Sequence, residues 1–217
     1  MGKYIKLFQT HAQYQAFTQT EDFVLPNVSY CEDVTDEVHY NPYVAPEPPE
    51  TRLVVTFNCH NTSWDYPIHN IEYHTGASVE DVLSEIEVDG VVLDGLPSTY
   101  RFSSTGEHTV KYTLIDNTTV PENMFYEIMS DIITSIYLPS TITYISQNAF
   151  ASGYGSFTSS ITIMAVEPPS VDSGAFTGSS YVDGILYVPT ESIEDYENYF
   201  LSNLDPYSEG NWTVQGI

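Results

Sequence analysis

The feature that most constrains the fold is a threefold repeat in the second half of the chain, with a period of about 25 residues. Its clearest marks are Phe125, Phe150 and Phe176, which are spaced 25 and 26 residues apart. An apolar residue lies five positions before each phenylalanine, and short apolar segments recur at the same interval. A unit this short cannot bury its own apolar edge, so successive units must stack on one another. The sequence therefore predicts a stack of coils over residues 112–188.

Each coil is expected to contribute one short strand, whose alternate side chains point inward, and one phenylalanine that fills the interior. The expected strands are Tyr112–Leu114, Ile136–Leu138, Ile161–Ile163 and Leu186–Val188. The predicted repeat core consists of Val120, Phe125, Ile136, Leu138, Ile145, Phe150, Ile161, Ile163, Val171 and Phe176.

The best-formed unit, residues 136–150, reads I-Y-L-P-S-T-I-T-Y-I-S-Q-N-A-F. It resembles the leucine-rich repeats of the Bacteroidetes surface-antigen (BspA-like) type, in which a strand, a Pro-Ser turn, an apolar triplet and an Asn-Ala-Phe run form each coil. The first unit departs from this pattern because Met124 stands where the alanine is expected. The period lies within the range of leucine-rich repeats. The resemblance covers about a third of the chain and implies a short solenoid that needs a cap at each end.

The segment 52–111 is predicted to form an all-β domain that resembles a small sandwich and caps the first coil. Its strand signals are Leu53–Cys59, Tyr100–Phe102 and His108–Leu114, and the last two are expected to pair across the intervening turn. Two Asp-Gly pairs indicate a hairpin between them. The apolar residues of Val82–Val88 fit a helical face as well as they fit a strand, and the sequence leaves both open.

Residues 189–217 are predicted to close the last coil. Thr190–Phe200 has helical periodicity, with Thr190 as the expected N-cap and acidic residues near the positive N-terminus of the helix. The apolar residues of this helix share one face, which we expect to cover the open coil. After the helix, Trp212 and Val214 indicate an edge strand.

The first 45 residues are typical of a small β-α-β-β unit, which has too little core to be stable alone. The segments Tyr4–Phe8, Leu25–Tyr30 and Val38–Tyr43 resemble an N-terminal module of virion proteins from phages that infect Bacteroidales, including the crAss-like gut phages. The resemblance implies a docking segment that attaches a projection to the particle. Residues 46–51 follow as a stiff, proline-rich linker. The residues expected to dock are Tyr4, Ile5, Leu7, Phe8, Pro26, Val28, Tyr30, Tyr40 and Tyr43.

The charge of the chain excludes one class of partner. The chain carries 5 Lys and Arg against 30 Asp and Glu, a net charge of −25 at pH 7. Such a surface repels nucleic acid. We also expect no membrane partner, because no apolar run reaches the roughly 18 residues of a span and the N-terminal residues do not match a secretory signal. The 18 Tyr and 10 Phe residues are of the kind that protein interfaces use.

No catalytic motif is recognisable in the sequence, so we expect neither an enzyme nor a bound cofactor or metal. Cys59, His60, His69 and His74 lie close together in the chain, but their spacing matches no zinc template. The Asp-Gly turns could hold Ca²⁺ but lack the ligand ladder of an EF-hand, and Ca²⁺ binding stays open. The sequence also leaves a disulfide between Cys31 and Cys59 open, while it favours two free thiols.

Together these features predict a mainly β protein with a few short helices, built from a docking module, a sandwich-like domain and a capped solenoid. The functional hypothesis is a non-enzymatic protein on the exterior of a virion, a head-fibre or decoration subunit that binds capsid or other virion proteins. A homo-oligomer is expected, with a trimer as its proposed state, together with contact to host glycans or proteins. The alternatives are a tail-associated virion protein and a bacterial cell-surface leucine-rich-repeat adhesin.

Overall fold

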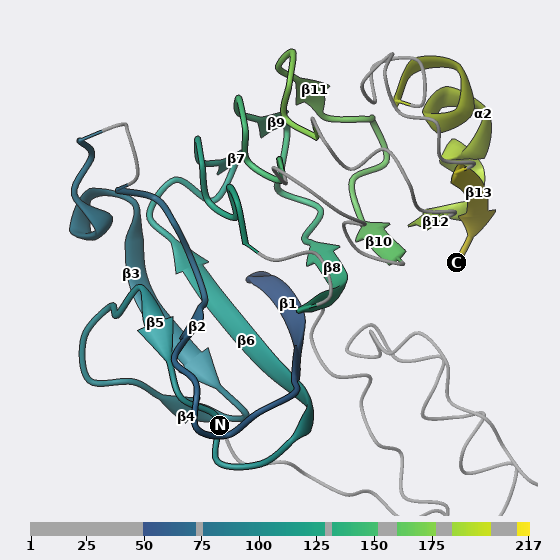
Figure 1. Ribbon diagram of the computed structural model, residues 1–217. Helices are drawn as coiled ribbons and strands as arrows, with labels where there is room; N and C mark the ends of the chain where they lie inside the picture. Colours follow the sequence, from purple (N-terminus) through teal and green to yellow (C-terminus); the bar gives the residue numbers. More distant parts are fainter. Residues whose placement is uncertain (1–49, 73–75, 129–131, 152–159, 177–183, 201–211) are drawn as a thin grey trace, which may run out of the picture. The chain divides into compact units, whose positions relative to one another are not determined.

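The computed structural model describes residues 50–72, 76–128, 132–151, 160–176, 184–200 and 212–217 (Figure 1). The chain divides into two compact units, Met1–Glu47 and Pro48–Ile217, and all described residues belong to the second. The predicted docking module with its nine docking residues therefore lies outside the described residues, as does the linker up to residue 49.

The second unit is mainly β and is built around one eight-stranded sheet with the strand order β13-β12-β10-β8-β1-β6-β3-β4. The strands β8, β10, β12 and β13 run parallel to one another, whereas β1, β6, β3 and β4 pair antiparallel. Because β1 is antiparallel to both β6 and β8, it joins the two halves of the sheet. The bounds are β1 Leu53–Cys59, β3 Leu83–Val88, β4 Val91–Val92, β6 Gly106–Leu114, β8 Ile133–Leu138, β10 Ser160–Ile163, β12 Gly184–Val188 and β13 Trp212–Gly216.

The segment that the sequence left ambiguous is the strand β3, preceded by the short helix η1 (Val79–Asp81). A register shift between Leu83 and Glu85 lets both Leu83 and Ile86 lie on the buried face, although they are three residues apart. A β-bulge of this kind adds one residue to the strand and so breaks its alternation. The bulge therefore produces the three-residue spacing that also fits a helix. The predicted hairpin follows, with Asp89 and Gly90 as its two-residue turn, both at positive φ.

The strands of the repeat region form two sets, and the strands within each set run parallel to one another (Figure 1). One set is β8, β10 and β12 in the large sheet, and the other is a three-stranded sheet of β7 (Thr119–Val120), β9 (Tyr144–Ile145) and β11 (Ser170–Val171). Between them the rings of Phe125, Phe150 and Phe176 stack, with centroid separations of 5.6 and 5.1 Å and interplanar angles of 12° and 19°. Backbone hydrogen bonds repeat with the same period, from Phe125 N to Ala149 O and from Phe150 N to Ala175 O, both 2.8 Å.

One position in each repeat unit requires left-handed backbone. Asn123 and Asn148 have φ of 57° and 56°, and Gly174 has φ of 81°. Each lies two residues before the phenylalanine of its unit. Glycine and asparagine enter this region at lower cost than other residues. The turn geometry therefore accounts for the choice of asparagine or glycine at this point of the repeat.

The structure buries the predicted repeat core almost completely. Nine of its ten residues are at most 3% exposed, and the tenth, Val171, is partly buried against the same core. This core is continuous with the inward side chains of β1, β3 and β6, among them Phe57, Ile86 and Tyr112. A single hydrophobic core therefore extends through the unit.

The predicted boundary between residues 111 and 112 falls inside the strand β6. The repeat pattern places Tyr112–Leu114 next to Ile136–Leu138, but β1 lies between these two segments and pairs with both. Leu53–Cys59 has alternating burial over seven residues; it pairs with β6 along its whole length and with β8 from Val54 to Phe57. The predicted all-β domain (52–111) and the predicted repeat region (112–188) thus share one sheet.

The expected pairing of Tyr100–Phe102 with His108–Leu114 is wrong. Thr99–Tyr100 forms the strand β5, which pairs with β2 (Tyr66–Pro67), while β6 pairs with β1 and β3. The segment 52–111 therefore contributes four strands to the large sheet and a separate two-stranded sheet, rather than two comparable sheets of a sandwich. Two-residue strands are too short to show the alternation on which sequence-based prediction depends.

The C-terminal residues cover the last repeat unit (Figure 1). A helical segment runs through η2 (Thr190–Ser192), α2 (Ile193–Asp195) and η3 (Tyr196–Phe200), and Tyr196 is fully buried with its hydroxyl donating to Ala165 O at 2.8 Å. Thr190 is not the N-cap as expected, since its Oγ1 donates to Ile217 O at 3.1 Å. The predicted edge strand is confirmed as β13. No helix in the described ranges is long and apolar enough to cross a membrane.

Candidate functional site

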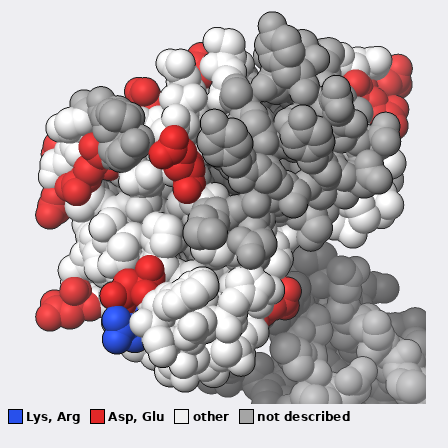
Figure 2. All heavy atoms as spheres, viewed as in Figure 1, with Lys and Arg blue, Asp and Glu red and all other residues white. Residues whose placement is uncertain are grey.

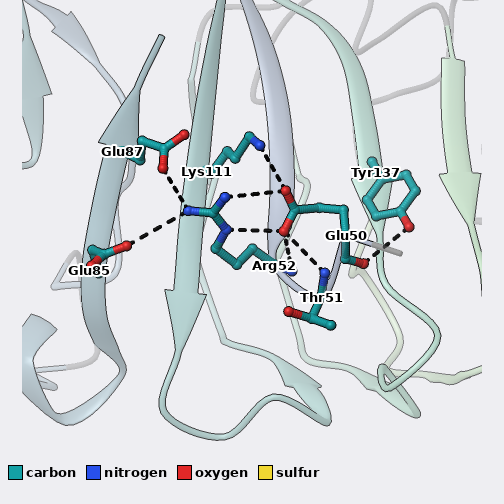
Figure 3. A network of polar contacts seen from close by, with 7 residues as sticks. All are labelled: Glu50, Thr51, Arg52, Glu85, Glu87, Lys111 and Tyr137. Atoms are coloured by element: carbon teal, nitrogen blue, oxygen red, sulfur yellow. Dashed lines mark hydrogen bonds and ion pairs between the residues drawn. The ribbon is translucent and has the colours of Figure 1, made fainter. Parts of the chain in front are cut away.

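The first candidate is a charged cluster at the point where the chain enters the large sheet (Figure 3). Arg52 lies between Glu50 on one side and Glu85 and Glu87 on the other. Its Nε and Nη2 donate to the two carboxylate oxygens of Glu50 at 3.0 and 3.3 Å, and its Nη1 donates to Glu87 Oε2 at 2.8 Å. Lys111 Nζ donates to Glu50 Oε2 at 2.8 Å. The network therefore links β3 and β6 to the segment that leads into β1.

This network keeps Glu50 ionised. Burial alone would raise the pKa of Glu50, but the hydrogen bonds from Arg52 and Lys111 outweigh it and lower the pKa to about 2. The hydrogen bonds of Arg52 to Glu50 and Glu87 raise the pKa of Arg52 above its usual value. Tyr137 adds a bond from its hydroxyl to Glu50 O at 3.2 Å. Since Arg52 and Lys111 both bind its carboxylate, Glu50 anchors the start of β1 to the neighbouring strands.

The second candidate is the outward face of the parallel strands. No charged residue occurs in β8, β10, β12 or β13, although the whole chain carries a net charge of −25. Tyr137, Thr162, Tyr187 and Gln215 lie opposite one another in successive strands and form one row across this face. Ser135, Ser160, Ile185 and Thr213 form the neighbouring row.

Acidic side chains gather elsewhere on the unit. Figure 2 shows acidic side chains near the η1 end and over the helix α2. The acidic residues of the C-terminal helical segment are Glu191, Glu194, Asp195 and Glu197. The parallel strands therefore offer hydroxyl and tyrosine groups without net charge, a chemistry suited to binding a neutral polar partner.

A third candidate is a Ser-His-Asp arrangement that the sequence analysis did not identify. His108 is 6% exposed, and its Nδ1 lies 2.6 Å from Asp89 Oδ2. Its Nε2 lies 3.4 Å from Ser104 Oγ but 2.9 Å from Ser104 O. A carbonyl oxygen can only accept a hydrogen bond, so Nε2 carries a proton and cannot act as the base that activates a serine.

His108 is instead a structural clamp between two turns. Burial alone would lower its pKa, but the hydrogen bonds to Asp89 and to Ser104 O raise the pKa above its usual value. Asp89 Oδ1 also accepts from Thr109 N at 2.9 Å, and the Phe102 ring stacks on the imidazole at 4.5 Å. The histidine thus holds the Asp89 turn against the Ser104 turn.

No group of three or more metal-ligating side chains comes together within the described ranges. Cys59 is buried and forms no disulfide, whereas its neighbour His60 is exposed. His69 is buried, which lowers its pKa because burial disfavours the charged form. His74 and Cys31 lie outside the described residues.

A small hollow of about 130 Å³ lies at the end of β1 and β6 that is closest to Arg52. Tyr112, Asn117 and Pro139 contribute to its walls. The hydroxyl of Tyr112 already donates to Ile68 O, and Arg52 is bound by its carboxylate partners. The polar groups of Tyr112 and Arg52 are therefore already engaged in contacts within the protein.

Sequence reasoning missed the Glu50 network and the His108 clamp for different reasons. The alternation in β6 places His108 on the inward face, and a histidine among buried apolar residues is a readable signal for a satisfied polar contact. Glu50, in contrast, stands in the segment predicted as a linker, and nothing local indicates that Lys111 lies beside it.

Comparison with known proteins gave no match: no family model, no curated protein and no solved structure matches this chain.

Proposed function

We propose that the chain is a non-enzymatic structural protein on the exterior of a bacteriophage virion, a head-fibre or decoration subunit. In this proposal residues 1–45 dock the protein to capsid or other virion proteins, and the second unit projects a short solenoid of the leucine-rich-repeat type. The resemblance of the N-terminal segments to a module of virion proteins suggests that the chain is attached to a phage particle. The stacked repeat region suggests that the second unit projects from it. A homo-oligomer, with a trimer as the proposed state, would place several projections side by side.

The observation that carries the projecting role is the repeated stacking of the units. The rings of Phe125, Phe150 and Phe176 form one interior column, and the parallel strands on both sides of it keep the same register. Such a stack is extended along one axis and exposes a row of equivalent positions on each strand. These properties support a spacer that presents a surface to a host glycan or protein.

The test is mass spectrometry of purified phage particles. The proposal expects the chain in intact particles at a fixed ratio to the major capsid protein, and expects external protease to cleave it while the capsid stays intact. A variant that lacks residues 1–45 should be absent from particles while it is still expressed. Absence of the full chain from particles would reject the proposal, and cleavage only after particle disruption would reject the exterior location.

Two alternatives share the same repeat evidence. A tail-associated virion protein would be found in isolated tails rather than in tail-free heads, so analysis of the two fractions separates it from a head fibre. A bacterial cell-surface adhesin would be found on intact cells in the absence of phage. Surface labelling of uninfected cells separates this alternative from both virion proteins.

A further inference from the structure

A short strap joins the all-β part of the second unit to the first repeat unit. The strap consists of residues 68–71, which directly follow β2. At its start, Ile68 N donates to Ser98 O at 2.9 Å, and Ile68 O accepts from the hydroxyl of Tyr112. The side chains of Ile68 and Ile71 are at most 1% exposed and belong to the common core. Apolar burial therefore holds the strap at both of its ends.

In its middle, the strap continues the backbone ladder of the repeats. Within the stack, the amide of one phenylalanine donates to the carbonyl that precedes the next phenylalanine, as from Phe125 N to Ala149 O at 2.8 Å. The corresponding carbonyl before Phe125 belongs to Met124, and it accepts from Asn70 N, also at 2.8 Å. Asn70 thus takes the position that the phenylalanine amide of a preceding unit would take.

The side chain of Asn70 supplies a second bond of the same ladder. Within the repeats, Glu127 N donates at 2.9 Å to Ala151 O, the carbonyl that follows the phenylalanine of the second unit. The corresponding carbonyl of the first unit is Tyr126 O, and its donor is Asn70 Nδ2 at 2.8 Å. One asparagine therefore satisfies two backbone acceptors at the start of the stack. The strap is thus the cap that a short solenoid requires at its N-terminal end.

Between these anchors, the strap carries a buried histidine. His69 is 2% exposed, and neither of its ring nitrogens has a hydrogen-bond partner of normal geometry in the described part of the chain. Burial lowers its pKa, although the backbone of Leu96 and Pro97 and the exposed carboxylate of Glu72 favour the charged form. An imidazolium has two N–H donors, and burying a charge without acceptors costs more than burying the neutral ring. The closed strap therefore requires a neutral His69.

We propose that the strap is an acid-sensitive cap, which detaches from the first repeat unit when His69 takes up a proton. The protonated ring regains its hydration only by leaving the core, and the strap that carries it must then leave the core as well. Detachment breaks both bonds of Asn70 and uncovers the carbonyls of Met124 and Tyr126, the edge on which a preceding unit would rest. This opening does not depend on where the protein resides, so it can be tested apart from the proposed virion function.

The groups around His69 set the pH range of the opening. The segments bonded to the strap, 96–98 and 124–126, contain no acidic or basic side chain. Burial raises the pKa of the Tyr112 hydroxyl well above its usual value, so this partner of the strap stays neutral. Because the pKa of His69 is lowered, the closed strap is favoured above the ordinary value of about 6.5. It loses stability as pH falls from there towards the depressed value.

The experiment measures amide hydrogen exchange of the full chain by nuclear magnetic resonance above and below pH 6.5, with each rate corrected for the intrinsic rate of the peptide. The protection of the Ile68 and Asn70 amides should fall by up to about tenfold for each pH unit below 6.5. The amides of β1, which pairs on both sides, should change much less. His69→Leu keeps an apolar side chain and removes the titration, so its strap amides should show no such fall. His60→Gln is the matched control and should respond as the wild type does, because His60 is an exposed histidine in the connection between β1 and β2.

The wild type also provides a test that needs no variant. The ring resonances of His69 report its protonation, and their midpoint should coincide with the pH at which the strap amides lose protection. The proposal is overturned if His69 titrates while the strap stays protected, or if the strap and β1 lose protection to the same extent. It is also overturned if His69→Leu keeps the wild-type response, or if His60→Gln abolishes it.

Discussion

Single residues set the turns on which the repeat units depend. Asn148 has φ of 56°, a backbone region that is unfavourable for alanine. We expect Asn148→Ala to lower the free energy of unfolding by about 1 kcal/mol and Asn148→Gly to leave it nearly unchanged. Urea denaturation measures both. Asn117→Ala is the control, because Asn117 is exposed and does not have positive φ; equal losses at positions 117 and 148 would contradict the explanation.

The clamp of His108 and Asp89 predicts a particular pH dependence. The pKa of His108 is raised in the folded protein, so its contribution is fully present below the unfolded value of about 6.5 and is lost as pH rises through the raised value. Asp89→Asn removes the charged partner and keeps a residue that tolerates the φ of 48° at this turn. The difference in unfolding free energy between wild type and variant should shrink, by up to about 1 kcal/mol, between pH 6 and pH 8.

The comparison with Asp89→Asn isolates this effect from that of His69. Burial lowers the pKa of His69, so its contribution is present above about pH 6.5 and is lost as pH falls towards the depressed value. That dependence is common to both proteins and cancels in the difference. A difference that stays constant, or grows with pH, would show that His108 is not held as an imidazolium by Asp89.

At this scale the sequence is informative where a local rule applies. Asparagine or glycine two residues before each phenylalanine is a readable signal for left-handed backbone. The contact of His108 with Asp89 could not be predicted, because it requires knowing that two turns meet at one end of the sheet.

At the scale of elements, the pairing of the edge strand β13 with β12 includes a close contact between Gly184 and the Trp212 ring. A Cβ added to Gly184 would lie 2.5 Å from the Trp212 ring, so the indole covers the backbone of β12. We expect Gly184→Ala to displace Trp212 and to destabilise the pairing of β12 with β13 by about 1 to 3 kcal/mol. In a Trp64→Phe background, the emission of Trp212 should shift to longer wavelength, and the melting temperature should fall.

The reference for this measurement is Trp64→Phe with Gly184 intact, since Trp212 is then the sole tryptophan of both proteins. Unchanged emission in the alanine variant would mean that the indole does not rest on Gly184.

The strand β13 itself was predictable from its alternating residues. Its parallel partner was not, because register depends on contacts across the stack rather than on the strand sequence.

The same limit explains the other differences between expectation and structure. The strands of the repeat region are predictable because each carries inward apolar residues at a fixed interval. The position of β1 between β6 and β8 is not predictable in this way. β1 comes from an earlier part of the chain and is antiparallel to both strands, so it does not alter the spacing of the repeat in the sequence. The β-bulge of β3 is a further case, since it mimics helical spacing.

At the scale of the whole molecule, the continuous core makes a prediction about cooperativity. The sequence predicts two domains on either side of residue 111, whereas the structure has one sheet across that point and one core from Phe57 to Tyr196. A shared core of this kind unfolds as one unit. The tryptophans of the second unit lie in the loop before β2 and in β13, and so report on its two parts.

Two single-tryptophan proteins make this test direct. Trp212→Phe leaves only Trp64 as a probe, and Trp64→Phe leaves only Trp212. We expect each protein to show the same midpoint by its tryptophan emission as by far-ultraviolet circular dichroism in urea. Because Phe150 stacks on both Phe125 and Phe176, Phe150→Ala should lower both midpoints together, with a loss of about 3 to 5 kcal/mol. If the Trp64 signal kept its midpoint while the Trp212 signal moved, the repeat region would be a separate folding unit, and the strand β1 would not couple it to the rest of the sheet.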